Sequence, residues 1–147
     1  MHTEHLQNVA AWRVIAGWLV AAAIASLVAL ALLSVGLLHE ETTAANTWWS
    51  MVAIAVGFFA GGFFAGFRAI QAPMLHALGI GLTSLVVWFL LNALAALLVP
   101  TWTWPRMTPQ FAVAVLLVQM VAAIIGALLG YNIALRGKPG LSEHEPI

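Results

Sequence analysis

The sequence predicts an all-α integral membrane protein, an antiparallel bundle of four transmembrane helices. Hydrophobic residues make up 63% of the 147 residues and charged residues only 7%, whereas a soluble domain carries about 25% charged residues. Four stretches reach the roughly 20 apolar residues that cross the hydrocarbon core of a bilayer. The breaks between them are too short to hold a soluble domain, so residues 1–147 are expected to form a single transmembrane domain.

The four spans are separated by short polar or proline-bearing breaks. Pro73 and Pro109 suit the first turn of a helix, where a missing N–H costs little. The first stretch is too long for the apolar core of a signal peptide and is expected to remain as a helix. Gly137 and Pro139 stop the last helix, so residues 136–147 are expected to form a mobile cytoplasmic tail. The predicted spans are approximately 14–38, 48–67, 74–99 and 109–135.

Charges at the ends of the spans predict the orientation of the bundle. Basic residues near span ends favour the cytoplasm. On the predicted topology Arg106 alone falls on one side of the membrane, and the other basic residues fall on the opposite side: Arg13, Arg68, Arg136 and Lys138. Both termini are therefore expected inside the cell (N-in, C-in), in the inner (plasma) membrane.

Small residues recur at a spacing of four and predict close helix contacts. Lipid tails are as apolar as leucine, so close backbone approach and interhelical hydrogen bonds hold membrane helices together. Phe59, Phe63 and Phe67 are expected on the opposite side of the second span. Packing within one chain is the preferred interpretation, and oligomerisation through the second span is the alternative. The helix-packing residues are Gly57, Gly61, Gly62, Ala65, Gly66, Gly126 and Gly130, with Gly17, Ala21 and Ala25 in the first span.

Two amides form the most prominent polar pair inside the spans. Intramembrane polar residues are functional candidates by default, and no Asp, Glu, Lys or Arg lies deep in any predicted span. Asn92 and Gln119 lie almost symmetrically about the hairpin between the third and fourth spans, which predicts a similar depth. The preferred interpretation is an interhelical hydrogen bond; the alternative is a polar lining for a substrate path.

A basic rim is expected where the spans meet the cytoplasm. Arg13, Arg68, His76 and Arg136 would lie there. Ordinary anchoring at the membrane surface is the preferred interpretation, and binding of an anionic lipid headgroup is the sharper alternative.

No catalytic or metal site is predicted. The chain has no cysteine, which removes disulfides and thiolate metal sites, and no fixed acid–base pair or nucleophile stands out. His39 and His76 are expected at opposite membrane faces and so could not clamp one haem, although either could serve as a single axial ligand. With five basic and five acidic residues, no basic surface for nucleic acid is expected.

The second and third spans carry a motif that resembles a group of small bacterial membrane proteins of unknown function. A glycine-rich helix ends in Gly66-Phe67-Arg68, and the next helix enters through Leu75-His76. The resemblance covers about 25 residues plus the four-helix layout. It implies a four-helix inner-membrane protein and supplies no activity.

The expected function is therefore non-enzymatic. The chain would be a small accessory or structural subunit that packs in a larger membrane complex or with copies of itself, with lipid and membrane-protein subunits as partners and no cofactor. A small oligomeric transporter or channel is one alternative. A membrane protein that binds a lipid or a single-ligand cofactor is another.

Overall fold

The computed structural model of the chain describes residues 10–39, 44–69, 72–99, 101 and 109–136, and every helix among them is an α-helix. Each of the four helices is long and apolar enough to span a membrane, so the predicted all-α fold class is confirmed. The predicted mobile tail, apart from Arg136, lies outside the described residues. The helices are α1 (Ala11–Ser34), α2 (Ala44–Arg68), α3 (Pro73–Leu98) and α4 (Pro109–Arg136).

The predicted and observed spans differ most on either side of the first connection, where α1 stops at Ser34 rather than at residue 38 and α2 begins at Ala44 rather than at residue 48. Gly36 has a φ of +74°, a left-handed conformation that glycine adopts without strain. Gly36 N–H donates to the Leu33 carbonyl, and Leu37 N–H donates to the Leu32 carbonyl. These two bonds form a Schellman motif, and the chain turns away while the sequence is still apolar.

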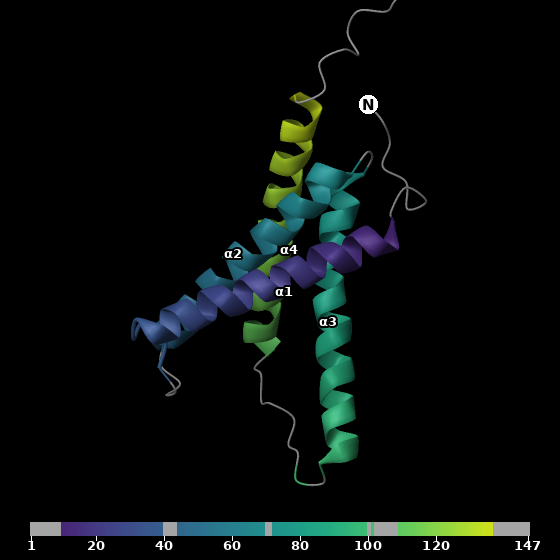
Figure 1. Cartoon of the computed structure of the whole chain (residues 1–147). Helices are drawn as coiled ribbons and strands as arrows, with labels where there is room; N and C mark the ends of the chain where they lie inside the picture. The colour runs from purple at the N-terminus through teal and green to yellow at the C-terminus, as the bar shows by residue number, and fades with distance from the viewer. Residues whose placement is uncertain (1–9, 40–43, 70–71, 100, 102–108, 137–147) are drawn as a thin grey trace, which may run out of the picture.

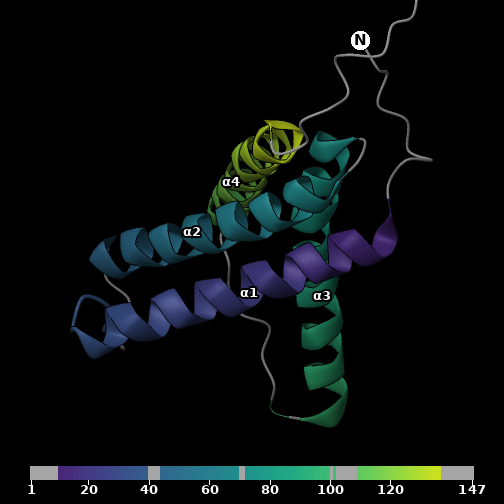
Figure 2. The ribbon, with the colours of Figure 1, turned by 45° about the horizontal axis from the view of Figure 1, so that its top comes forward.

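The helices form two hairpins, and the α1–α2 hairpin runs across the α3–α4 hairpin (Figures 1 and 2). α2 is the central helix, because the two most extensive helix contacts in the structure are those that it makes with α4 and with α1. α1 begins, and α2 and α4 end, toward the same end of the molecule (Figure 1). The bundle is thus assembled around the second helix.

The contact between α1 and α2 brings the two backbones together. A Cβ built on Gly57 would lie 2.5 Å from the Ala21 carbonyl oxygen and 2.6 Å from Ala25 Cβ. A Cβ built on Gly61 would meet the Gly17 carbonyl oxygen, and it would lie 2.6 Å from Ala21 Cβ. The small residues predicted at these positions therefore face one another along this contact.

A second glycine contact joins the neighbouring face of α2 to α4. A Cβ on Gly62 would collide with the backbone of Ala123, and one on Gly66 with the backbone of Ala127. From the other side, a Cβ on Gly126 would strike the Phe59 carbonyl oxygen, and one on Gly130 would strike that of Phe63. We call this contact the α2–α4 seam, formed by Gly62, Gly66, Ala123, Gly126, Ala127 and Gly130.

The phenylalanines that the sequence places opposite the glycines of α2 keep exposed or half-buried side chains. Phe59 is 36% and Phe67 50% exposed, although the backbones of Phe59 and Phe63 border the α2–α4 seam. The Phe63 and Phe67 rings stack at 6.1 Å between centroids. Phe58 is the buried phenylalanine of α2, at 4% exposure.

Asn46, near the start of α2, is hydrogen-bonded to His39, which follows the end of α1. Asn46 Oδ1 accepts from the His39 N–H at 3.0 Å, and Asn46 Nδ2 donates to the His39 carbonyl at 2.7 Å. Asn46 is buried. Its amide thus satisfies both backbone polar groups of His39, a pairing that a buried or lipid-facing loop requires.

Candidate functional site

Two polar side chains at membrane depth, those of Ser84 and Gln119, line a cavity between α3 and α4. Its volume is about 270 Å³, slightly below the usual range for small-molecule pockets. Trp18 Nε1 on α1 donates to Ser84 Oγ on α3 at 3.0 Å, which holds this hydroxyl in place. The cavity is lined by Ser84, Leu85, Trp88, Ala112, Val115, Leu116 and Gln119.

Asn92 and Gln119 do not pair as the sequence predicted. Asn92 Nδ2 donates to the Trp88 carbonyl of its own helix at 2.9 Å, and its buried Oδ1 has no hydrogen-bond partner among the described residues. Gln119 lines the cavity beside Ser84, and a Cβ on Gly81 would lie 2.9 Å from Met120 Cγ. Gln119 is therefore level with Ser84, about 12 Å along α3 from Asn92 at 1.5 Å per residue.

The physical reason for this correction is the stagger of the hairpin. Symmetry about the connecting loop assumes that α3 and α4 lie side by side with their ends aligned. In the structure the two helices are offset by about two turns relative to that assumption, since Gly81 lies opposite Met120. Depth in a hairpin depends on tilt and offset as well as on distance from the turn.

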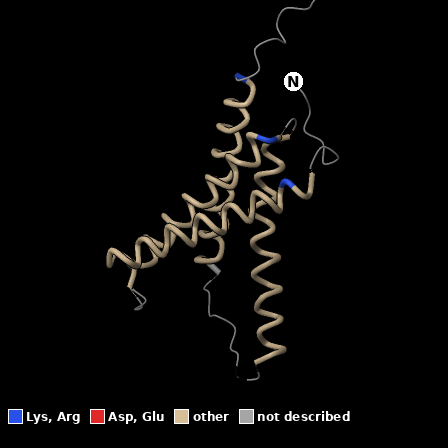
Figure 3. Tube along the Cα trace, in the orientation of Figure 1, with Lys and Arg blue, Asp and Glu red and all other residues tan. Residues whose placement is uncertain are grey.

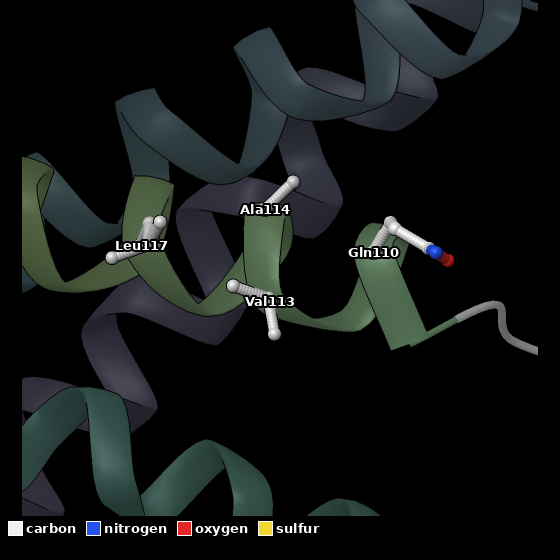
Figure 4. A pocket seen from close by; sticks show the side chains of 4 residues that line it. All are labelled: Gln110, Val113, Ala114 and Leu117. Atoms are coloured by element: carbon white, nitrogen blue, oxygen red, sulfur yellow. The ribbon is translucent and has the colours of Figure 1, made fainter.

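Two other hollows are apolar and open to the surroundings. One lies along a single helix, α4, where Gln110, Val113, Ala114 and Leu117 line it (Figure 4). The Gln110 amide points away from the other three side chains (Figure 4). The second lies between α2 and α4, with only apolar residues around it, among them Ala55, Val118 and Ala122. Neither hollow presents a polar group that would orient a ligand.

His76 is fully buried and both of its ring nitrogens have backbone partners. Nε2 accepts from the Ala10 N–H at 3.2 Å, and Nδ1 lies 2.8 Å from the Ala72 carbonyl. Because Nε2 accepts, the hydrogen-bond network assigns the proton to Nδ1, which donates to Ala72. His76 in this state has no nitrogen left for a haem iron.

The same two bonds tie the start of α1 to the start of α3. Ala72, which accepts from His76, has a φ of +53°, a left-handed conformation that is strained for a residue with a Cβ. His76 is therefore also removed from the predicted lipid-headgroup rim, because a side chain at 0% exposure cannot reach a headgroup. The sequence predicts its position near the start of the helix but not its burial.

The described arginines lie toward one end of the molecule (Figure 3). The guanidinium of Arg68 lies 4.5 Å from the centroid of the Phe64 ring, and that of Arg13 lies 5.5 Å from the Trp12 ring. Both distances are within the range of cation–π attraction. Arg13, Arg68 and Arg136 thus share the end that the charge pattern predicted, and their side of the membrane stays a prediction.

Three features of the polar framework escaped sequence reasoning. The two hydrogen bonds between Asn46 and the His39 backbone, which we call the Asn46 clamp, join residues seven apart in the sequence. The hydrogen bond between Trp18 and Ser84 joins residues 66 apart. The third is the left-handed Ala72, where no glycine marks the conformation. A local signal existed only for the end of α1, where Gly36 follows the last helical turn.

The described residues hold no group of three or more His, Cys, Asp or Glu side chains that could bind a metal ion. Comparison with known proteins adds no assignment, since no family model, curated protein or solved structure matches this chain. The resemblance at the second and third helices to a group of small bacterial membrane proteins therefore stays a prediction.

Proposed function

We propose that this chain is a non-enzymatic integral membrane subunit that binds laterally to a transmembrane helix of another protein or of a second copy. In this proposal both termini lie in the cytoplasm and the bundle sits in an inner (plasma) membrane. The basic ends of α1, α2 and α4 support that orientation.

The observation that supports the subunit role is the outer half of α3. The buried residues of α3 lie between Pro73 and Gly81, and Asn92 is the one described residue beyond them that is buried. Apolar side chains on several sides of this half are exposed, among them Leu85, Phe89, Leu94 and Leu97. In Figure 1 this half extends past the α1–α2 hairpin. Such a helix offers an open flank to a second helix in the bilayer.

The glycine contacts show which faces of α2 are already covered and so cannot bind a partner helix. Both small-residue faces of α2 are occupied, one by α1 and the other by α4. The alternative prediction, oligomerisation through α2, would require these contacts to separate. We therefore propose the outer half of α3, rather than α2, as the surface for lateral association.

Single-cysteine crosslinking tests the subunit proposal, because the chain has no cysteine of its own. Leu94→Cys places a thiol on α3, where Leu94 is 52% exposed, and Leu27→Cys places one on α1, where Leu27 is 65% exposed. The thiol is labelled with a maleimide–benzophenone reagent, whose photoactivated ketone inserts into a nearby C–H bond and so needs no cysteine on the partner. In native membranes we expect a defined adduct from Leu94→Cys and none from Leu27→Cys. The adduct mass separates a second copy from another protein. No adduct, or equal adducts from both variants, contradicts the proposal.

A second candidate function, favoured by the cavity between α3 and α4, is binding of a small amphiphilic molecule. Gln119 makes no hydrogen bond among the described residues, so its amide is available in a lining whose other polar groups are the Ser84 hydroxyl and the Trp88 indole. Filling the cavity with Val115→Phe is expected to remove any molecule that co-purifies with the chain and is seen by native mass spectrometry. Val113→Phe, outside the cavity on the same helix, is the matched control; equal retention by both variants counts against a ligand.

A further inference from the structure

Arg13 on α1 and Arg68 on α2 are a pair of cations at the same end of the contact between these two helices. Gly17 and Ala21 on α1 face Gly61 on α2, and Gly17 also faces Ala65. Arg13 precedes Gly17 by four residues, so it continues the same face of α1 by one turn. Because the helices are antiparallel, one more turn of α1 reaches the level of residues 65–69 on α2. Arg68 lies within that range.

No described group neutralises these two cations. Neither arginine has a salt bridge or hydrogen bond from its side chain among the described residues, and the Nε of Arg13 is buried without a partner. An unsatisfied hydrogen-bonding group of a charged side chain is costly where water is excluded. The described part of the chain contains no Asp or Glu (Figure 3). The pair therefore lacks a counter-charge within the described structure.

The surroundings of Arg13 and Arg68 favour binding of an anion. The first turn of α1 has no acidic residue, and its N-cap, Ala10, makes no side-chain cap bond. The positive end of that helix dipole thus lies beside Arg13. Each guanidinium also lies near an aromatic ring of its own helix, Trp12 or Phe64, which limits the positions that the charged groups adopt.

We propose that Arg13 and Arg68 together bind a phosphate group, that of an anionic phospholipid in the leaflet at this end of the bundle. Arginine binds phosphate oxygens through paired N–H donors, and a headgroup phosphate lies at the depth where these helices begin and end. His76, buried and already bonded, takes no part. A free phosphate compound would satisfy the same chemistry, so the test distinguishes the two sources.

The test is native mass spectrometry and thermal unfolding of the full chain in nanodiscs or detergent. The three arms contain phosphatidylglycerol, phosphatidylcholine, and phosphatidylcholine with millimolar inorganic phosphate. The wild-type chain is expected to retain phosphatidylglycerol and to unfold at a higher temperature with it than with phosphatidylcholine. Stabilisation by inorganic phosphate equal to that by phosphatidylglycerol would assign the site to a soluble phosphate compound and overturn the lipid as its source.

Matched variants locate the site. Arg13→Gln and Arg68→Gln are each expected to lower retention of phosphatidylglycerol about tenfold, as expected for loss of a charge-assisted hydrogen bond. Arg136→Gln removes the same charge at the end of α4 and is expected to retain the lipid. Arg68→Lys keeps the charge and loses the paired donors, so an intermediate loss is expected while the fold persists. Equal losses in Arg136→Gln and Arg68→Gln, or full retention in Arg68→Gln, would overturn the proposal.

Discussion

α2 and α3 are of similar length and both are strongly apolar, yet they relate to the bundle in opposite ways. Both contact the other three helices, but α2 makes the two most extensive contacts, and its backbone approaches α1 on one face and α4 on the next. α3 is buried only in its first half, apart from Asn92, and exposes leucine and phenylalanine beyond Gly81. Hydropathy therefore places a helix in the bilayer, while the spacing of small residues decides whether it becomes the centre of the bundle.

The glycines of α2 make helix formation less favourable, and the contacts that they allow must offset this loss of free energy. Each glycine in a helix interior is about 1 kcal/mol less favourable than alanine, and α2 has four, namely Gly57, Gly61, Gly62 and Gly66. Because hydrophobicity does not bring helices together in lipid, the offset comes from close packing and from weak Cα–H···O contacts. α3 carries leucine on its open half, so its surface suits lipid or another helix.

The largest loss of stability is expected when a glycine in the α2–α4 seam is replaced by a larger residue. Gly62→Leu would drive four carbons into the backbone of Ala123, which is part of a helix and cannot yield locally. We expect the free energy of unfolding to fall by about 3 kcal/mol or more, measured by thermal or denaturant unfolding in one detergent.

The matched change on α3 is Leu90→Ala, where Leu90 is 58% exposed. Its effect is expected to stay within about 0.5 kcal/mol. Similar losses from both variants would show that α2 is no more central than the outer half of α3.

The second largest effect is expected for His76→Ala, at the buried end of α3. The change leaves the Ala10 N–H without its acceptor and opens a space around a fully buried side chain. A loss of about 2–4 kcal/mol follows, with faster hydrogen exchange at the start of α1. His39→Ala serves as the control, because the His39 side chain is exposed and only its backbone bonds to Asn46; equal losses would remove the structural role of His76.

A smaller effect is expected where Asn46 joins the two ends of the α1–α2 connection. Asn46→Ala removes both hydrogen bonds to the His39 backbone, which corresponds to about 1–2 kcal/mol. The measurement is again thermal unfolding. Asn132→Ala, at an exposed position on α4, should leave stability unchanged, and an unaltered Asn46→Ala would mean that the clamp contributes nothing.

The smallest effect is expected for Asn92→Leu on the outer half of α3. Sequence reasoning, with its Asn92–Gln119 bond, predicts lower thermal stability. In the structure the change removes a buried oxygen that has no partner and one bond to a carbonyl of the same helix. Replacement by an apolar group of similar size is then nearly neutral or slightly stabilising. A clear drop in melting temperature would instead support a hydrogen bond between Asn92 and Gln119.

The sequence predicts the existence of all four helices, because about 20 consecutive apolar residues leave few other structures possible in lipid. It also points to Gly57, Gly61, Gly62 and Gly66, since spacing by four defines a helix face. It does not say which neighbour each face meets. That depends on the crossing of the two hairpins, which no local pattern encodes.

The candidate site was less predictable for the same reason. Ser84 and Trp18 meet only because α1 crosses α3, and Gln119 reaches the cavity only through the offset of α3 and α4. The sequence singles out His76, but the burial of its side chain depends on Ala72 and on the start of α1. Spacing along the sequence does not predict side-chain contacts that depend on how the helices cross and on how they are offset.

The central claim is that backbone contact along the α2–α4 seam holds the bundle together, and one paired measurement tests it most directly. Gly66→Ala places a methyl group on the Ala127 carbonyl, whereas Gly81→Ala places one 2.9 Å from the flexible Met120 side chain. Unfolding of both variants in the same detergent should show Gly66→Ala less stable than the wild-type chain by about 2 kcal/mol and Gly81→Ala unchanged or more stable, since alanine favours the helix. Equal stabilities for the two variants would contradict the account.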